Sequence, residues 1–235
     1  RAWYAAQGAE CVGTTAESVV GEVVKHSTTE VTQEQTAAWL EQIAILQAHL
    51  VGVEGALLLE FNIPRMGRRV DAVLLSGSVV FVLEFKASPE FTASAVNQVW
   101  DYALDLKNFH EASHHAVIVP ILIATQAERS PVEVLKADHD DVYRPLCLRS
   151  ADLRPVIEEI LMSRSGAALD AAQWLDSSYR PTPTIIEAAR ALYAQHSVDA
   201  IRCFDADAEN LARTVRHIEG VVDDARANQR KVICF

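Results

Sequence analysis

The sequence lacks the features that would place this protein in a membrane or outside the cell. No stretch approaches the roughly 18 uninterrupted apolar residues of a membrane-spanning helix, and residues 1–13 have no signal-peptide pattern. We therefore expect a cytoplasmic protein with no membrane partner. Internal repeats and long low-complexity tracts are also missing, so ordinary folded domains are expected.

Cysteine and positive charge are both scarce. Cys11, Cys147, Cys203 and Cys234 form no CxxC pair and have no histidine nearby at zinc spacing, so we predict reduced, mostly buried thiols rather than a zinc site or a disulfide framework. The formal net charge of -11 excludes a protein that binds nucleic acid by bulk charge. Any contact with a polyanion must be local, as at "PRMGRR" (64–69), or metal-mediated.

What the chain does contain is enough apolar sequence for a sizeable core, with 50% hydrophobic residues over 235 positions. Residues 32–50 predict a helix with apolar spacing at Ala38, Ile43, Leu46 and Leu50, and with Thr32 as its N-cap. Three strands follow at 55–64, 68–76 and 78–86, then a helix at 94–113, a strand at 115–125 and a helix at 151–165. This order predicts an α/β sandwich.

A second module is predicted after a linker at 175–184, which is rich in proline, serine and threonine. It comprises a helix at 185–196, a short strand at 199–204, a long helix at 207–229 and a strand at 231–235. We place the domain boundary between residues 175 and 176.

Three charged residues lie inside the two apolar strand segments 68–76 and 78–86. The strand period of two places Glu84 and Lys86 on one side and Phe85 on the other, while Asp71 lies on the neighbouring strand. Two carboxylates beside an ammonium can hold Mg²⁺, and Mn²⁺ in its place, next to a lysine that orients the water or stabilises developing charge. The alternative is a solvated ion pair worth under about 1 kcal/mol, and ExK alone also occurs by chance.

The surrounding pattern resembles the PD-(D/E)XK nuclease superfamily over roughly residues 35–125. "RRVDAVLL", a short turn, "VVFVLEFK" and a helix with Gln98 and Tyr102 match its motif and the QxxxY element of its RecB-like branch. The resemblance implies a restriction-endonuclease-like sandwich with a central mixed sheet flanked by helices. It also implies a metal on Asp71 and Glu84, an assisting Lys86, and contact of Gln98 and Tyr102 with the substrate backbone. Val70 replaces the proline of the superfamily's name.

Other charged residues could join such a site. Glu60 and Glu41 are candidates for an additional metal-ligating acid, with Glu60 preferred and a solvent-facing edge charge as its alternative. Arg65, Arg68 and Arg69 are predicted to contact the phosphate backbone, although they could merely solubilise the turn.

Two further clusters are interpreted as surface features rather than metal sites. His110, His114 and His115 lie at a helix end, where surface histidines are common. Asp138, His139, Asp140 and Asp141 lack the alternation of a calcium loop.

A second resemblance rests on both modules, on "FNIPRMGRRVDAVLL", "VLEFK", "QVWDYALDLKNFHEASH", "ENLARTVRHIE" and "KVICF". These stretches resemble bacterial proteins in which a PD-(D/E)XK-like domain precedes a Schlafen-like DNA/RNA helicase domain. The resemblance implies that residues 176–235 are the linker and the first elements of that P-loop ATPase or helicase domain. The chain stops at Phe235, before any GxxxxGK[ST] motif, so we expect no ATP site within it and a helicase or ATPase domain beyond it. We predict a Mg²⁺-dependent nuclease acting on DNA or RNA, in nucleic-acid processing or antiphage defence. The alternative is an inactive nuclease fold that binds nucleic acid or serves as a scaffold for the motor. Homo-oligomerisation is left open.

Overall fold

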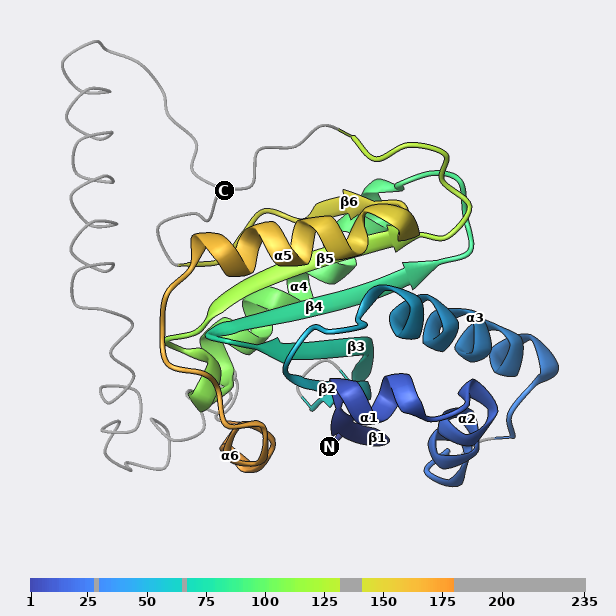
Figure 1. The fold of residues 1–235 in the computed structure, drawn as a ribbon, viewed down its shortest axis with the longest axis horizontal. Coiled ribbons are helices and arrows are strands. Elements are labelled where there is room, and N and C mark those ends of the chain that lie inside the picture. Colours follow the sequence, from blue (N-terminus) through green and yellow to red (C-terminus); the bar gives the residue numbers. More distant parts are fainter. Residues whose placement is uncertain (28–29, 65–66, 132–140, 180–235) are drawn as a thin grey trace, which may run out of the picture. The chain divides into compact units, whose positions relative to one another are not determined.

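Six described strands form one mixed sheet whose order in space equals their order in the chain (Figure 1). Strands β1 to β4 form an antiparallel meander, whereas β5 and β6 each run parallel to the strand before them. The computed structural model describes residues 1–27, 30–64, 67–131 and 141–179, which belong to one unit that spans Arg1–Pro181. The strands are β1 (Tyr4–Gln7), β2 (Ala56–Ile63), β3 (Arg68–Ser76), β4 (Val79–Lys86), β5 (Val117–Ala124) and β6 (Leu146–Leu148).

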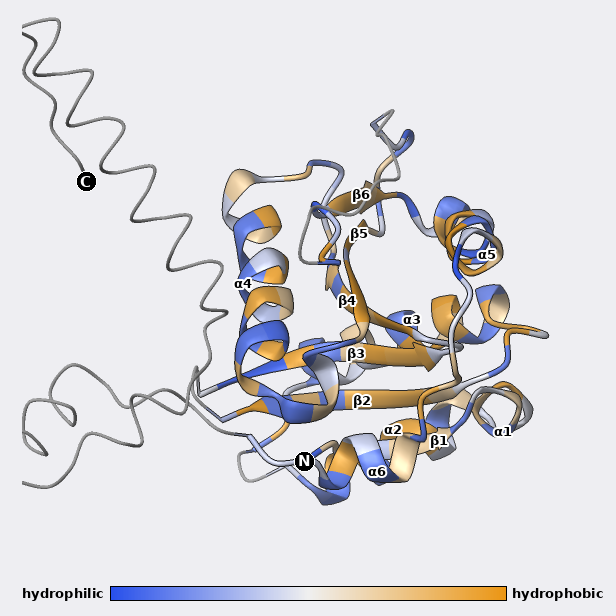
Figure 2. Cartoon of the chain, turned by 90° about the vertical axis from the view of Figure 1, so that its left-hand side faces the viewer, coloured by the Kyte–Doolittle hydropathy of each residue, from blue (hydrophilic) through white to orange (hydrophobic). Residues whose placement is uncertain are grey.

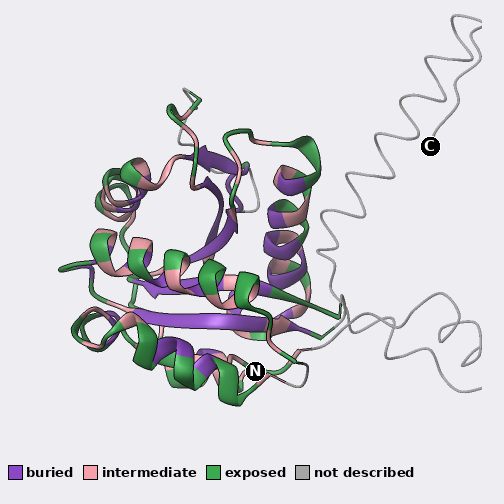
Figure 3. Cartoon of the chain, turned by 90° about the vertical axis from the view of Figure 1, so that its right-hand side faces the viewer, coloured by how far each residue is buried: buried purple, intermediate pink, exposed green. Residues whose placement is uncertain are grey.

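Helices cover both faces of this sheet. Helix α4 packs on one face, while α3 and α5 pack on the other (Figure 2). The strands between them are almost entirely buried and the helices expose only their outer sides (Figure 3). The described helices are α1 (Gly8–Gly13), α2 (Ala16–Lys25), α3 (Gln33–His49), α4 (Ala93–Phe109), α5 (Leu153–Ser163) and α6 (Ala171–Asp176), with short 3-10 turns η1 (Glu111–Ser113) and η2 (Ser150–Asp152).

The predicted run of helix, three strands, helix, strand and helix is confirmed as α3, β2, β3, β4, α4, β5 and α5. Thr32 caps α3 as expected, because its hydroxyl accepts a hydrogen bond from the Gln35 amide at 3.2 Å. The buried stripe of α3 differs by one residue from the prediction. Trp39 is buried and Ala38 is exposed, so the core positions are 39, 43, 46 and 50.

Several elements were not foreseen from the sequence. The first 25 residues supply β1, α1 and α2, and the three-residue strand β6 extends the sheet beyond β5. The stretch predicted as a linker begins inside the folded unit, because the predicted boundary at 175/176 falls within α6. The next residues also contact this unit: the carbonyl of Ser178 accepts a backbone hydrogen bond from Glu111, and Tyr179 forms a β-bridge with His110. The remainder of the predicted second module, from residue 180, lies outside the described residues.

Two predictions about burial and membranes can be compared with the described part of the chain. Cys11 and Cys147 are buried thiols that take part in no disulfide, as expected, while Cys203 and Cys234 lie outside the described residues. Among the described helices, none is long and apolar enough to cross a membrane.

Candidate active site

The candidate site lies where β3 separates from β4. Their ladder ends at the pair Ala72 and Leu83. One residue further, the Asp71 carboxylate accepts a hydrogen bond from the backbone amide of Phe85 at 2.8 Å. A side chain therefore takes the place of the next ladder bond, because a buried strand amide needs an acceptor. This contact fixes the Asp71 carboxylate beside the end of β4.

Glu84 is the most deeply buried charged group of the site, with a side chain only 3% exposed. Its Oε1 accepts hydrogen bonds from Lys86 Nζ and from Gln98 Nε2, both at 2.8 Å. Its Oε2 is buried and has no hydrogen-bond partner in the described structure. The predicted parity is confirmed, because Glu84 and Lys86 meet on one side while Phe85 packs into the core on the other. The Glu84 carboxylate itself is buried and does not face solvent.

Helix α4 brings Gln98 and Tyr102 to the same carboxylate. Thr92 caps this helix by accepting from the Ala95 amide, which starts α4 shortly after the end of β4. Residues four apart share a helix face, and Gln98 Nε2 donates to the Tyr102 hydroxyl at 2.9 Å as well as to Glu84. The sequence-predicted pair thus lies in the site.

Burial and mutual repulsion disfavour the state in which the Asp71 and Glu84 carboxylates are both ionised with no cation between them. Burial, and then the charge of Glu84, raise the pKa of Asp71 well above its usual value. Burial also raises the pKa of Glu84, although the hydrogen bond and charge of Lys86 and the nearby backbone amide of Asp71 oppose this. Burial lowers the pKa of Lys86, but its bond to Glu84 and the nearby negative charges outweigh burial, so the net pKa is raised and the ammonium stays protonated.

Glu60 lies close to this pair but does not join it. Its oxygens accept hydrogen bonds from Trp39 Nε1 at 2.8 Å and from Arg69 Nε at 2.7 Å. The backbone of Glu60 has φ of 51°, a left-handed conformation that interrupts the strand alternation and turns the side chain toward α3. In the described residues, no three His, Cys, Asp or Glu side chains are grouped as metal ligands. The expected three-carboxylate set with Glu60 is therefore not formed, and neither is its solvent-facing alternative.

The other predicted residues are spread around this centre. Arg68 is exposed and close enough to Tyr102 to influence its pKa, whereas Arg69 pairs with Glu60. Arg65 lies outside the described residues. Glu41 is exposed on α3.

The three histidines of the predicted surface cluster do not share one environment. His114 and His115 are exposed, as predicted for surface histidines. His110 instead is fully buried, and its Nδ1 lies 2.8 Å from the Ser113 hydroxyl, which also accepts from the Trp174 indole at 3.0 Å. The segment with Asp138, His139 and Asp140 lies outside the described residues, and Asp141 beside it is exposed.

Two tryptophans near the site were missed by sequence reasoning. Trp39 donates to Glu60, and Trp3 lies under the Arg69 guanidinium, which is 4.1 Å from the ring centroid. The helical spacing of 39, 43, 46 and 50 could have predicted that Trp39 is buried on the same side of α3 as the other three residues. Trp3 gave no such signal, because it precedes a strand of only four residues.

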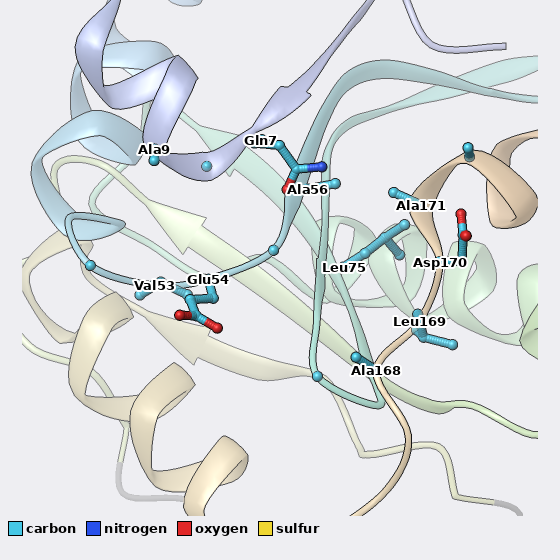
Figure 4. Close-up of a pocket in the computed structure, with 15 residues that line it drawn as sticks. Gln7, Ala9, Val53, Glu54, Ala56, Leu75, Ala168, Leu169, Asp170 and Ala171 are labelled. Atoms are coloured by element: carbon cyan, nitrogen blue, oxygen red, sulfur yellow. The ribbon is translucent and has the colours of Figure 1, made fainter.

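A large cavity lies at the opposite end of the sheet, around the β3–β4 turn. It has a volume of about 810 Å³ and is bordered by the segments 7–9, 52–56 and 168–172 (Figure 4). Its described walls carry the carboxylates of Glu54 and Asp170 but no lysine, arginine or histidine. The candidate catalytic residues do not contribute to it.

Comparisons with models of protein families, with curated proteins and with solved structures found no match to this chain.

Proposed function

We propose that the protein is a Mg²⁺-dependent nuclease that hydrolyses phosphodiester bonds of DNA or RNA at the Asp71–Glu84 pair. The observation that carries the proposal is the Glu84 carboxylate, which is buried beside a second carboxylate and has one oxygen without a hydrogen-bond partner in the described structure. Leaving a buried acceptor unsatisfied costs about 1–3 kcal/mol, and more when the group is charged. A bound cation would offset both that cost and the repulsion between the two acids.

The donor set fits a hard divalent cation. Mg²⁺ is usually held by one or two carboxylates and keeps several waters, so Asp71 and Glu84 suffice without Glu60. Both are oxygen donors, and Mn²⁺ accepts the same kind of ligand. When bound, such an ion acidifies a coordinated water and neutralises charge on the phosphoryl group.

The remaining residues of the site would orient the metal-binding carboxylate and stabilise charge on the substrate. Gln98 fixes the Glu84 carboxylate through Oε1, which leaves Oε2 for a ligand. Lys86 carries a positive charge at the edge of the site, with a 37% exposed side chain, and can stabilise negative charge that develops on a phosphate. The Tyr102 oxygen accepts from Gln98, which leaves its own hydrogen for a further acceptor. Tyr102 is only 1% exposed, so a substrate oxygen would have to enter the site to reach it.

The arrangement of elements supports a restriction-endonuclease-like sandwich as the specific fold. Helix α3 precedes the antiparallel strands β2–β4, and the crossover helix α4 lies between β4 and β5. Asp71 and Glu84 lie where the β3–β4 ladder ends. By the same resemblance, the partners would be DNA or RNA and a C-terminal helicase or ATPase domain, with a role in nucleic-acid processing or defence. An inactive scaffold is the weaker proposal, because an inactive descendant gains nothing from a buried carboxylate with one oxygen left without a hydrogen bond.

Cleavage of labelled single- and double-stranded DNA and RNA, with Mg²⁺, Mn²⁺ or EDTA, tests this function. We expect cleavage with either metal and none with EDTA. Asp71→Asn and Glu84→Gln should each abolish it, because they remove a metal-binding charge and keep the size of the side chain. Lys86→Ala should lower kcat by about 100-fold or more, in the range of other charge-stabilising groups.

Asp101→Asn is the matched control, because Asp101 is an exposed acid on the same helix as Gln98. It should cleave at the wild-type rate. Wild-type cleavage by the Asp71→Asn protein would show that the activity belongs to another site or to a contaminant.

A further inference from the structure

A second polar cavity lies at the same end of the sheet as the Asp71–Glu84 pair. Its volume is about 400 Å³, and its lining consists of Arg1, Ala2, Trp3, His26, Asn62 and Arg69. The described lining has two arginines and a histidine but no carboxylate, in a chain of formal net charge -11. A local basic pocket on an acidic protein selects for anions.

The Arg69 side chain in this cavity is held in a fixed orientation. Its Nε donates to Glu60 at 2.7 Å, and its guanidinium lies over the Trp3 ring. Glu60 in turn is fixed by Trp39. The Arg69 side chain is 39% exposed and that of Glu60 only 10%, so an anion arriving from solvent meets the guanidinium first. An arginine that is already ordered loses less side-chain entropy when it binds.

We propose that this cavity binds a phosphate group of a nucleic-acid strand, next to the phosphate that is cut. The identity of the strand rests on the proposed nuclease function, whereas the affinity of the pocket for phosphate does not. Arg69 and Asp71 are two residues apart on β3, which separates their Cα atoms by about 7 Å. That separation suits neighbouring phosphates of one extended strand.

Four of the six lining residues have a part in this recognition. Arg69 and Arg1 supply charged donors, and the exposed His26 at the end of α2 supplies a further ring N–H donor. Trp3 offers an aromatic surface for the sugar or base attached to the phosphate. A terminal phosphate monoester and an internal diester share this chemistry, so the test must separate them.

Binding can be measured without turnover in the Asp71→Asn protein. Inorganic phosphate is titrated while the indole signal of Trp3 and the ring signals of His26 are followed by NMR. We expect both residues to respond, and Arg69→Gln to weaken binding about tenfold, a difference of about 1.4 kcal/mol. Lys25→Gln is the matched control, because it removes one charge next to His26 but outside the cavity, and it should bind phosphate as before.

Oligonucleotides then identify the source of the phosphate. With single-stranded DNA, Arg69→Gln should reduce the slope of log affinity against log salt by about 1, as expected for one lost phosphate contact. A loss that appears only when the strand carries a 5′-phosphate assigns the pocket to a terminal monoester. A loss with and without that group assigns it to an internal diester.

The pocket proposal is overturned if phosphate leaves Trp3 and His26 unchanged, or if Arg69→Gln binds it as tightly as Lys25→Gln. Should Arg69→Gln fail to fold, His26→Gln provides the same comparison, because His26 lies outside the Glu60 network.

Cleavage kinetics separate this proposal from the nuclease function. If cleavage depends on metal and on Asp71 but Arg69→Gln leaves KM unchanged, the pocket fails and the nuclease stands. If no metal-dependent cleavage occurs and phosphate still binds at Arg69, the nuclease fails and the phosphate pocket stands.

Discussion

Asp71 places a carboxyl group where its ionised form is disfavoured. Burial and the neighbouring Glu84 raise its pKa, so its ionised form is less stable in the folded chain than in the unfolded one. For an acid with a raised folded pKa, this contribution to stability is present at low pH and is lost as the pH rises through the folded value. At pH 7, well above the ordinary pKa of an aspartate, this buried carboxyl group therefore opposes folding until a cation binds.

Replacing Asp71 by asparagine should consequently raise the thermal stability of the metal-free protein at pH 7. The amide oxygen can still accept from Phe85, so the strand contact is kept while the charge is removed. A gain of about 1 kcal/mol would raise Tm by about 2–4 °C in a chain of this size. Differential scanning fluorimetry in EDTA measures it.

Mg²⁺ supplies the second half of this test. It should raise the Tm of the wild-type protein but not of Asp71→Asn, because only the former binds the ion. A lower Tm for the variant in EDTA would contradict the electrostatic account.

At the scale of single elements, the sequence predicted best where side chains repeat. Strands β2, β3 and β4 and helix α4 were predicted because their apolar patterns are long. The side-chain period of two along a strand also placed Glu84 and Lys86 correctly on one side of β4. The stripe on α3 was misassigned at Ala38, since small and large apolar residues give the same periodicity. The left-handed backbone of Glu60 gave no sequence signal, because that conformation usually belongs to glycine. The hydrogen bond between Trp39 and Glu60 could therefore be recognised only in the folded structure.

The residue just before β2 must be a glycine, because the backbone there approaches β3 closely. Gly55 has φ of 140°, and a Cβ there would lie 2.1 Å from the carbonyl oxygen of Leu75 on β3. We expect Gly55→Ala to destabilise the protein by about 2 kcal/mol or more, since both the backbone conformation and the contact are strained.

Gly21→Ala is the opposite control. Gly21 lies inside helix α2 with nothing within 4 Å of the added Cβ, so alanine should stabilise by about 0.5–1 kcal/mol. Urea denaturation of both variants checks the signs, and equal stability of Gly55→Ala and wild type would contradict the described β2–β3 packing.

For the molecule as a whole, the buried His110 ties the end of α4 to the segment after α6. Its ring packs 4.3 Å from the Trp174 ring, and burial, followed by the charge of Arg1, lowers its pKa to about 4. The unfolded chain then binds a proton more readily than the folded chain between the usual His pKa of 6.5 and about 4. Stability should fall as pH falls through that window.

Between pH 7 and 5, His110 should account for a loss of about 2 kcal/mol in the free energy of unfolding. His110→Asn retains an acceptor for Ser113 and cannot be protonated, so its stability should change less over this range. Urea denaturation at several pH values measures the difference. The same pH dependence in wild type and variant would assign the acid sensitivity to other groups.

Asp71, Glu84, Lys86 and Gln98 all come from one continuous segment, 71–98, in which Ser76 pairs with Val79 across a tight turn. The edge strand β1 instead pairs Gln7 with Ala56, which closes a loop of about 50 residues. By the logarithmic dependence of loop-closure entropy on length, that closure costs about 2.5 kcal/mol more than the turn. Local contacts therefore favour early formation of the β3–β4 hairpin that carries the carboxylates. We expect the basic cavity between Trp3 and Arg69 to form afterwards.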